Sequence, residues 1–288
     1  MRRVRLFVAM TIVLGLLGAG LVVLHGYDQR RLTSTAETVA GGDPLTDAQL
    51  FERYVLFAYA NLKHPSYGEL PNEGVRLYYL LNPMHPSAGD VLRWGVDYRG
   101  PCGSSSRVVV AMLKSRGIPA RPLLLLDEHG ESIHTVVEAH VEGRWVVGDP
   151  SMGVVYHDAA GRLLTRDQLA EDTALFLSNV AAHAEYPAAY RYDSVTRFNW
   201  RKIPVVLPAI RALLVATIGE RRVESIVRPV IWMHPKLVYG LIILALASLC
   251  AWLALRSRAR LLNRATTPAR ITAAERSESR ELRSVSSR

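Results

Sequence analysis

Three residues of the types used in thiol catalysis are spread over the middle of this sequence: Cys102, His134 and Asp149. A thiol becomes a strong nucleophile when a base takes its proton. The base in turn needs a third group that fixes its tautomer and stabilises its positive charge. The sequence therefore predicts Cys102 as a nucleophile, His134 as its base and Asp149 as the group that orients the imidazole.

Cys102 lies at the start of an expected helix over residues 102–116. The dipole and the free N–H groups at a helix N-terminus lower the pKa of a thiol placed there. Gly100 and Gly103 keep the neighbourhood small, so a substrate backbone can approach the sulfur. The second cysteine, Cys250, lies in a separate apolar segment, so no disulfide within the domain is expected.

The elements that must position these residues predict an α+β domain, with helices first and antiparallel strands after them. Helices are expected from Thr46, which forms a capping box with Gln49, and over 72–81, 87–94, 102–116 and 165–179. The helix at 102–116 is apolar on all sides in its middle, so we expect it to be buried. Strands are expected over 121–126, 134–141, 144–147 and 154–156.

Four short blocks resemble the core of the transglutaminase-like superfamily, namely RGPC at 99–102, GIPAR at 117–121, HTVVE at 134–138 and GRWVVGDP at 143–150. The resemblance covers roughly residues 90–160 and is to a membrane-anchored bacterial member. It implies a papain-like core, a buried helix packed on an antiparallel sheet. It also implies Cys102 as nucleophile, His134 as general base and then acid, and Asp149 as orienter. The Cys102 N–H is the expected first oxyanion donor, and Trp94 and Tyr98 are candidates for the second.

The strand that carries His134 offers a second, weaker interpretation. His134, Glu138 and His140 share one strand face, and all three are of residue types that bind metal ions. The sequence offers no fourth ligand for a zinc site, and Glu138 is expected to pair with Arg121. We therefore expect no metal and no cofactor.

Two uncharged stretches of 19 residues, 6–24 and 237–255, are each long enough to cross a bilayer as a helix. The first is also compatible with a cleaved signal peptide, but its apolar run is longer than a typical h-region. The two ends together carry the whole net charge of +9, on arginines next to the spans. The positive-inside rule then places both termini in the cytoplasm and the middle outside, and it argues against nucleic acid as a partner. No N-x-S/T sequence occurs, which favours a bacterial periplasm over a glycosylating pathway.

The expected organisation is a transmembrane anchor at 1–27, a linker at 28–44, a transglutaminase-like domain at 45–200, an amphipathic juxtamembrane segment at 201–236, a second transmembrane helix at 237–255 and a basic, disordered cytoplasmic tail at 256–288. The juxtamembrane segment contains an apolar stretch at 203–219. A third span there would place the basic ends on opposite sides. We expect this helix to lie on the outer membrane surface or to dock on the domain.

The expected function is a cysteine hydrolase or acyltransferase that acts on an amide or ester carbonyl through an acyl-thioester on Cys102. Water as acceptor makes it a peptidase or amidase, and an amine makes it a transamidase. The expected partners are a peptide or other amide-bearing substrate outside the cytoplasm and the lipid bilayer of the bacterial inner membrane. The alternative is a catalytically weak or inactive binding module of the same family in a membrane-associated assembly. A structural role in a larger membrane protein complex is compatible with either.

Overall fold

A computed structural model describes residues 2–62, 86–95, 101–183, 186–187, 189–200, 205–224, 226–227 and 233–285. The chain divides into two compact units. One unit comprises Met1–Leu24 and Lys236–Arg288, and the other comprises His25–Pro235. The helix expected at 72–81 lies outside the described residues.

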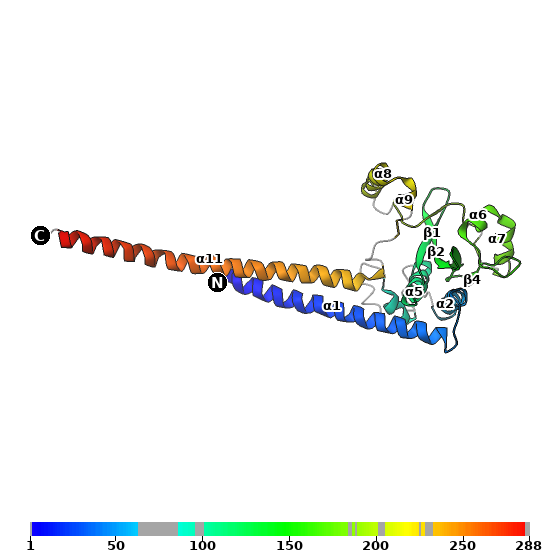
Figure 1. Ribbon diagram of the computed structural model, residues 1–288, viewed down its shortest axis with the longest axis horizontal. Helices are drawn as coiled ribbons and strands as arrows, with labels where there is room; N and C mark the ends of the chain where they lie inside the picture. Colours follow the sequence, from blue (N-terminus) through cyan, green and yellow to red (C-terminus); the bar gives the residue numbers. More distant parts are fainter. Residues whose placement is uncertain are drawn as a thin grey trace. The chain divides into compact units, whose positions relative to one another are not determined.

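The unit His25–Pro235 is built on a five-stranded sheet in which every neighbouring pair is antiparallel (Figure 1). Glu142 and Gly143 join the second strand to the third with φ values of 51° and 76°, the two positive angles of a type I′ turn. This tight turn fixes the register of the pair, so that Val137 lies opposite Gly148. The strand order is β4-β3-β2-β1-β5, with β1 at Ala120–Leu126, β2 at Ser132–Val141, β3 at Arg144–Asp149, β4 at Val154–Val155 and β5 at Val195–Thr196.

Helix α5 (Pro101–Ser115) packs on this sheet and contacts β1, β2 and helix α2 (Asp47–Asn61). Its residues 108–113 are all buried, as the uniformly apolar sequence predicted. The helix begins with proline, which suits the first helical position because proline has no N–H to leave unpaired. It ends where Gly117, with φ 79°, lets the Ile118 N–H donate to the Leu113 carbonyl. The predicted α+β core, a buried helix packed on an antiparallel sheet, is confirmed.

Alternate residues of β2 belong to different hydrophobic clusters on the two faces of the sheet. Val137 packs in the cluster of α2 and α5, whereas Val136 packs with residues of α6 (Arg166–Glu171) and α7 (Thr173–Val180). The sequence predicted one helix over 165–179, but Asp172 divides it. Asp172 ends α6, and its side chain accepts a hydrogen bond from the Leu175 N–H at the start of α7.

Three predicted helix starts are confirmed by complete capping boxes. Thr46, Ser87 and Thr165 each accept a hydrogen bond from the backbone N–H three residues on, and the side chain at that position bonds back. These caps begin α2, α4 (Ala88–Trp94) and α6.

The other unit contains the first part of α1 (Arg2–Ala40) and nearly all of α11 (Pro235–Val285), and each of these helices has a stretch long and apolar enough to cross a membrane. They pack against each other at a pair of glycines. A Cβ atom added to Gly18 would lie 3.0 Å from the Gly240 carbonyl oxygen, and one added to Gly240 would lie 3.0 Å from that of Gly18. Glycine at both positions therefore allows the two backbones to approach closely, as in many membrane helix pairs.

The predicted linker at 28–44 is wrong, because α1 continues to Ala40. Four residues spaced four apart, Asp28, Leu32, Ala36 and Ala40, form a buried stripe along this part of the helix. Asp28 accepts hydrogen bonds from the Ser87 hydroxyl at 2.8 Å and from Arg93 at 3.0 Å. The buried side chains are mostly small or polar, which is why the sequence here does not look like a core helix.

The predicted disorder of the tail at 256–288 is also not found in the described residues, because α11 remains helical to Val285. This part of the sequence contains nine arginines and five alanines, two residue types with high helix propensity. The arginines and serines that indicated a disordered tail are thus compatible with a long helix.

Candidate active site

The pairing of β2 with β3 brings His134 and Asp149 together. Val137 lies opposite Gly148, so Asp149 comes next to Val136 and two residues from His134 on the same face. Diagonal neighbours of this kind lie within reach of long side chains. His134 Nε2 and Asp149 Oδ2 are 2.7 Å apart, and both side chains are buried, with exposed fractions of 3% and 0%.

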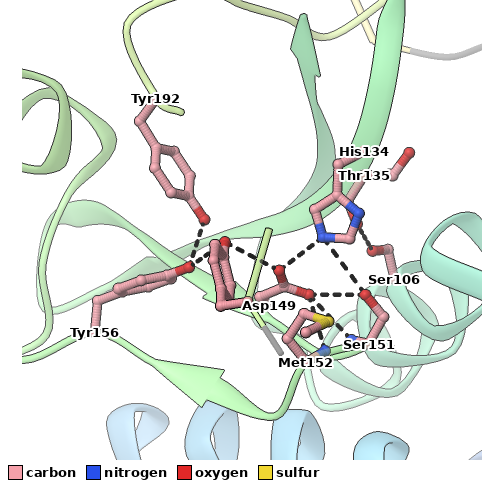
Figure 2. Close-up of polar contacts among 9 residues, drawn as sticks. Ser106, His134, Thr135, Asp149, Ser151, Met152, Tyr156 and Tyr192 are labelled. Carbon is pink, nitrogen blue, oxygen red and sulfur yellow. Dashed lines mark hydrogen bonds and ion pairs between the residues drawn. The ribbon is translucent and has the colours of Figure 1, made fainter. Parts of the chain in front are cut away.

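The Asp149 carboxylate is surrounded by hydrogen-bond donors (Figure 2). Its Oδ1 accepts from the Ser151 N–H, the Ser151 hydroxyl and the Met152 N–H at 3.1, 2.9 and 3.2 Å. Its Oδ2 accepts from the Tyr186 hydroxyl at 3.3 Å in addition to His134. Donors on both oxygens satisfy the hydrogen-bonding capacity of a fully buried carboxylate.

The second nitrogen of the His134 ring is left for Cys102. Nδ1 is buried and has no partner at full hydrogen-bond geometry among the described residues. Cys102, the second residue of α5, is partly exposed, and its thiol is close enough to interact with the ring. Thiol–imidazole pairs are often loose without a substrate and tighten when one binds. The structure thus brings together all three residues that the sequence singled out.

The charges of this group favour a thiolate and an imidazolium. Burial alone raises the pKa of the Cys102 thiol, but interaction with the His134 ring, the charge of that ring and a backbone hydrogen bond at Thr135 outweigh burial and lower it. Burial alone lowers the pKa of His134, but its bonds and charge interactions with Asp149 and Cys102 raise it to about 9. At neutral pH the imidazolium is therefore the stable form, and its charge favours the thiolate form of Cys102 more than in an ordinary thiol.

Tyr190 lies directly on the imidazole. The two rings are stacked with centroids 4.0 Å apart and planes 9° from parallel. Burial raises the pKa of Tyr190, and the charges of Cys102 and Asp149 raise it further, so the phenol stays neutral beside both groups. This stacked ring fixes the plane of the His134 imidazole.

Three further tyrosines form a chain of hydroxyls that ends on Asp149. Tyr192 donates to Tyr156 at 3.0 Å, and the hydroxyls of Tyr156 and Tyr186 are 2.8 Å apart. Because the Tyr186 hydroxyl donates its hydrogen bond to Asp149, the Tyr156 hydroxyl must be the donor in the bond between Tyr156 and Tyr186. Burial raises the pKa of all three phenols. The chain therefore stabilises the carboxylate without supplying a proton to it.

These four tyrosines, and the two serines Ser106 and Ser151 that support the site, were not among the residues predicted from the sequence. Tyr186, Tyr190 and Tyr192 fall within seven residues of each other, and this density of phenols in a loop is a signal that the sequence did contain. The Ser106 hydroxyl donates to the Thr135 carbonyl at 2.8 Å and ties α5 to β2 next to His134. Nothing in the spacing of Ser106 or Ser151 indicates these contacts.

The three candidate metal ligands on β2, His134, Glu138 and His140, do not form a metal-binding cluster in the described part of the chain. Glu138 is buried, and Arg121 and Arg197 bind it at 2.7 and 2.9 Å, as the sequence predicted for Arg121. His140 packs against the ring of Trp145. Of the two oxyanion candidates, Trp94 ends α4 and Tyr98 lies outside the described residues. The Cys102 N–H has no acceptor within its own helix, because it belongs to the first turn.

Comparison with known proteins agrees with the predicted family. Residues 74–150 match the family model of the transglutaminase-like superfamily, so this part of the chain carries a transglutaminase-like domain. A solved structure from Cytophaga hutchinsonii, provisionally named a cysteine protease, is similar over 43% of this chain and 37% of its own length, with 17% sequence identity and a TM-score of 0.31. The chain thus spans just over a third of that protein. No curated protein is similar enough to count as a match.

Proposed function

We propose that this chain is a membrane-anchored cysteine enzyme that forms an acyl-thioester on Cys102 from an amide or ester carbonyl. The observation that carries the proposal is the grouping of Cys102, His134 and a buried Asp149 within a transglutaminase-like domain. A thiolate and an imidazolium side by side are the reactive form of a cysteine nucleophile.

In the acylation step the Cys102 sulfur attacks the carbonyl carbon and forms a carbon–sulfur bond. The carbonyl oxygen takes up the negative charge, close to the Cys102 N–H. His134 then gives its Nδ1 proton to the leaving amine or alcohol as the carbon–nitrogen or carbon–oxygen bond breaks. The products are a thioester on Cys102 and a neutral imidazole.

In the second step the neutral His134 takes a proton from the acceptor, which attacks the thioester and releases the thiolate. Water gives an acid, and a primary amine gives a new amide. Asp149 keeps its charge throughout and stabilises the imidazolium whenever it forms. The Tyr190 ring and the tyrosine chain hold these groups in the orientation that both steps need.

The proposed location follows from the two apolar helices and the arginines beside them. The unit His25–Pro235 faces the periplasm of a bacterial cell, and both termini lie in the cytoplasm. The substrate is then a peptide or another amide-bearing molecule outside the cytoplasm.

Acylation of the full chain in lipid nanodiscs tests the proposal. With p-nitrophenyl acetate as the probe, we expect intact-mass spectrometry to show one acetyl group on the wild type, removable by hydroxylamine, and none on Cys102→Ala. Cys250→Ser is the matched control and should still be acylated. Adding a primary amine then reports whether the thioester passes to amine or to water. If the wild type is acylated no faster than Cys102→Ala, the enzyme proposal fails, and the binding module becomes the better interpretation.

A further inference from the structure

Helix α8 (Val206–Ile218) is apolar along almost its whole sequence, and Arg211 and Thr217 are its two polar residues. It has no buried residue among its thirteen. Its one charged residue, Arg211, bonds to Glu220 and lines a cavity of about 440 Å³ together with Val195 and Trp200. The half-buried side of α8 consists of Leu207, Arg211, Leu214 and Val215 and is apolar apart from Arg211.

The opposite side of α8 is apolar and exposed. It consists of six residues on one helical face, Val206, Ala209, Ile210, Leu213, Ala216 and Thr217. Leu213 is 65% exposed, and Val206 is 52% exposed. The single hydroxyl on this face, that of Thr217, donates to the Leu213 carbonyl at 2.9 Å, so it offers little polarity to water.

We infer that this face of α8 lies in the interface of the lipid bilayer, on the same side of the membrane as the unit His25–Pro235. An apolar face of this kind is unfavourable in water, because each exposed apolar Å² costs roughly 25 cal/mol relative to burial. The bilayer is expected to lie near α8, because the spanning stretch Pro235–Leu261 begins seventeen residues after Ile218. A helix of thirteen residues is only about 20 Å long, too short to cross a hydrocarbon core of about 30 Å. Its apolar face therefore inserts while its axis stays in the plane of the membrane.

This inference rests on the proposed membrane anchoring but not on the chemistry of Cys102. The sequence left two placements open for this helix, and the apolar face described above is the one that the described residues leave exposed. An interfacial α8 would hold the domain at a fixed height above the lipid. Substrates that reach Cys102 would then be those found near the membrane surface.

Depth-dependent fluorescence quenching of the full chain tests the inference. In a background of Cys102→Ser and Cys250→Ser, a single cysteine labelled with an NBD fluorophore replaces Leu213, and the protein is reconstituted in phosphatidylcholine vesicles with some phosphatidylglycerol. We expect nitroxide lipids labelled near the head group to quench Leu213→Cys several-fold more than Leu177→Cys. Leu177 is the matched control, because it is a leucine of α7 that is 56% exposed. Aqueous iodide should quench the two labels in the opposite order.

A third label, Leu246→Cys within α11, separates the interfacial placement of α8 from the proposed membrane anchoring of the chain. If nitroxide lipids quench the span label but not Leu213→Cys, and iodide quenches Leu213→Cys as strongly as Leu177→Cys, the inference is overturned while the anchoring stands. If Leu213→Cys is shielded from both quenchers, a protein surface covers α8, and the lipid assignment is also overturned. If the span label itself is not quenched by lipid, the proposed anchoring fails.

Discussion

Gly148 is the position where a single methyl group should disturb both the core and the site. It precedes Asp149 on β3, and a Cβ atom there would lie 2.8 Å from Phe51 Cζ and 3.0 Å from Val55 Cγ2. Ordinary carbon contacts are about 3.5–4.0 Å, so the strand and α2 would have to separate by roughly 0.5–1 Å. Phe51 and Val55 are fully buried and have no space to withdraw into. We expect Gly148→Ala to lower the free energy of unfolding by about 1–3 kcal/mol, the usual cost of overpacking.

Thermal unfolding of the full chain in detergent micelles, followed by near-ultraviolet circular dichroism, measures this effect. A domain of this size loses about 2–4 °C in midpoint for each kcal/mol. Because the shift moves Asp149 relative to His134, Gly148→Ala should also slow the alkylation of Cys102 at pH 7. Gly103→Ala is the control for the unfolding midpoint alone: beyond its chain neighbours and its own helix backbone the added methyl group meets no described atom within 4 Å, and alanine is favoured over glycine in a helix. If Gly148→Ala unfolds at the wild-type midpoint, the contact between β3 and α2 is not as tight as described.

Three further predictions concern charge, topology and the tail. Since the pKa of His134 is raised from 6.5 to about 9, its charge stabilises the fold fully below about pH 6.5 and ceases to do so as the pH rises through 9. From this shift we expect the wild type to differ in free energy of unfolding between pH 6 and pH 10 by on the order of 3 kcal/mol. Asp149→Asn removes the main charge that raises the pKa of His134, so denaturant titrations of the variant should show a smaller difference. An unchanged difference would contradict the role given to Asp149. Reporter fusions after Gly161 and after Arg264 should report opposite sides of the membrane, and the same side for both would mean that one span is wrong. Truncation after Arg270 should leave the unfolding midpoint of the unit His25–Pro235 unchanged. A large drop in that midpoint would show that the end of α11 supports that unit.

Much of the site was predictable because its signals are local in the sequence. A cysteine at a helix start, a histidine on the next strand but one and an aspartate at the end of the following strand meet through simple strand pairing. The capping boxes at Thr46 and Thr165 are likewise local, since each is complete within four residues.

The features that were missed depend on contacts between distant segments. Residues 28–40 of α1 are held in part by the buried Asp28, whose partners Ser87 and Arg93 lie some sixty residues away in the sequence. Strand β5 has only two residues and exists because it pairs with the edge of β1. The tyrosines at 186–192 reach the site from a loop, where no periodicity constrains their direction.

The pH dependence of Cys102 alkylation by iodoacetamide tests the central claim most directly. In a Cys250→Ser background Cys102 is the one thiol of the chain, so the label reports that site alone. We predict that the wild-type reaction persists well below the ordinary thiol pKa of about 8.5, and that His134→Ala moves the curve back up toward that value. Curves centred near 8.5 in both proteins would contradict the thiolate–imidazolium pair and, with it, the proposed chemistry.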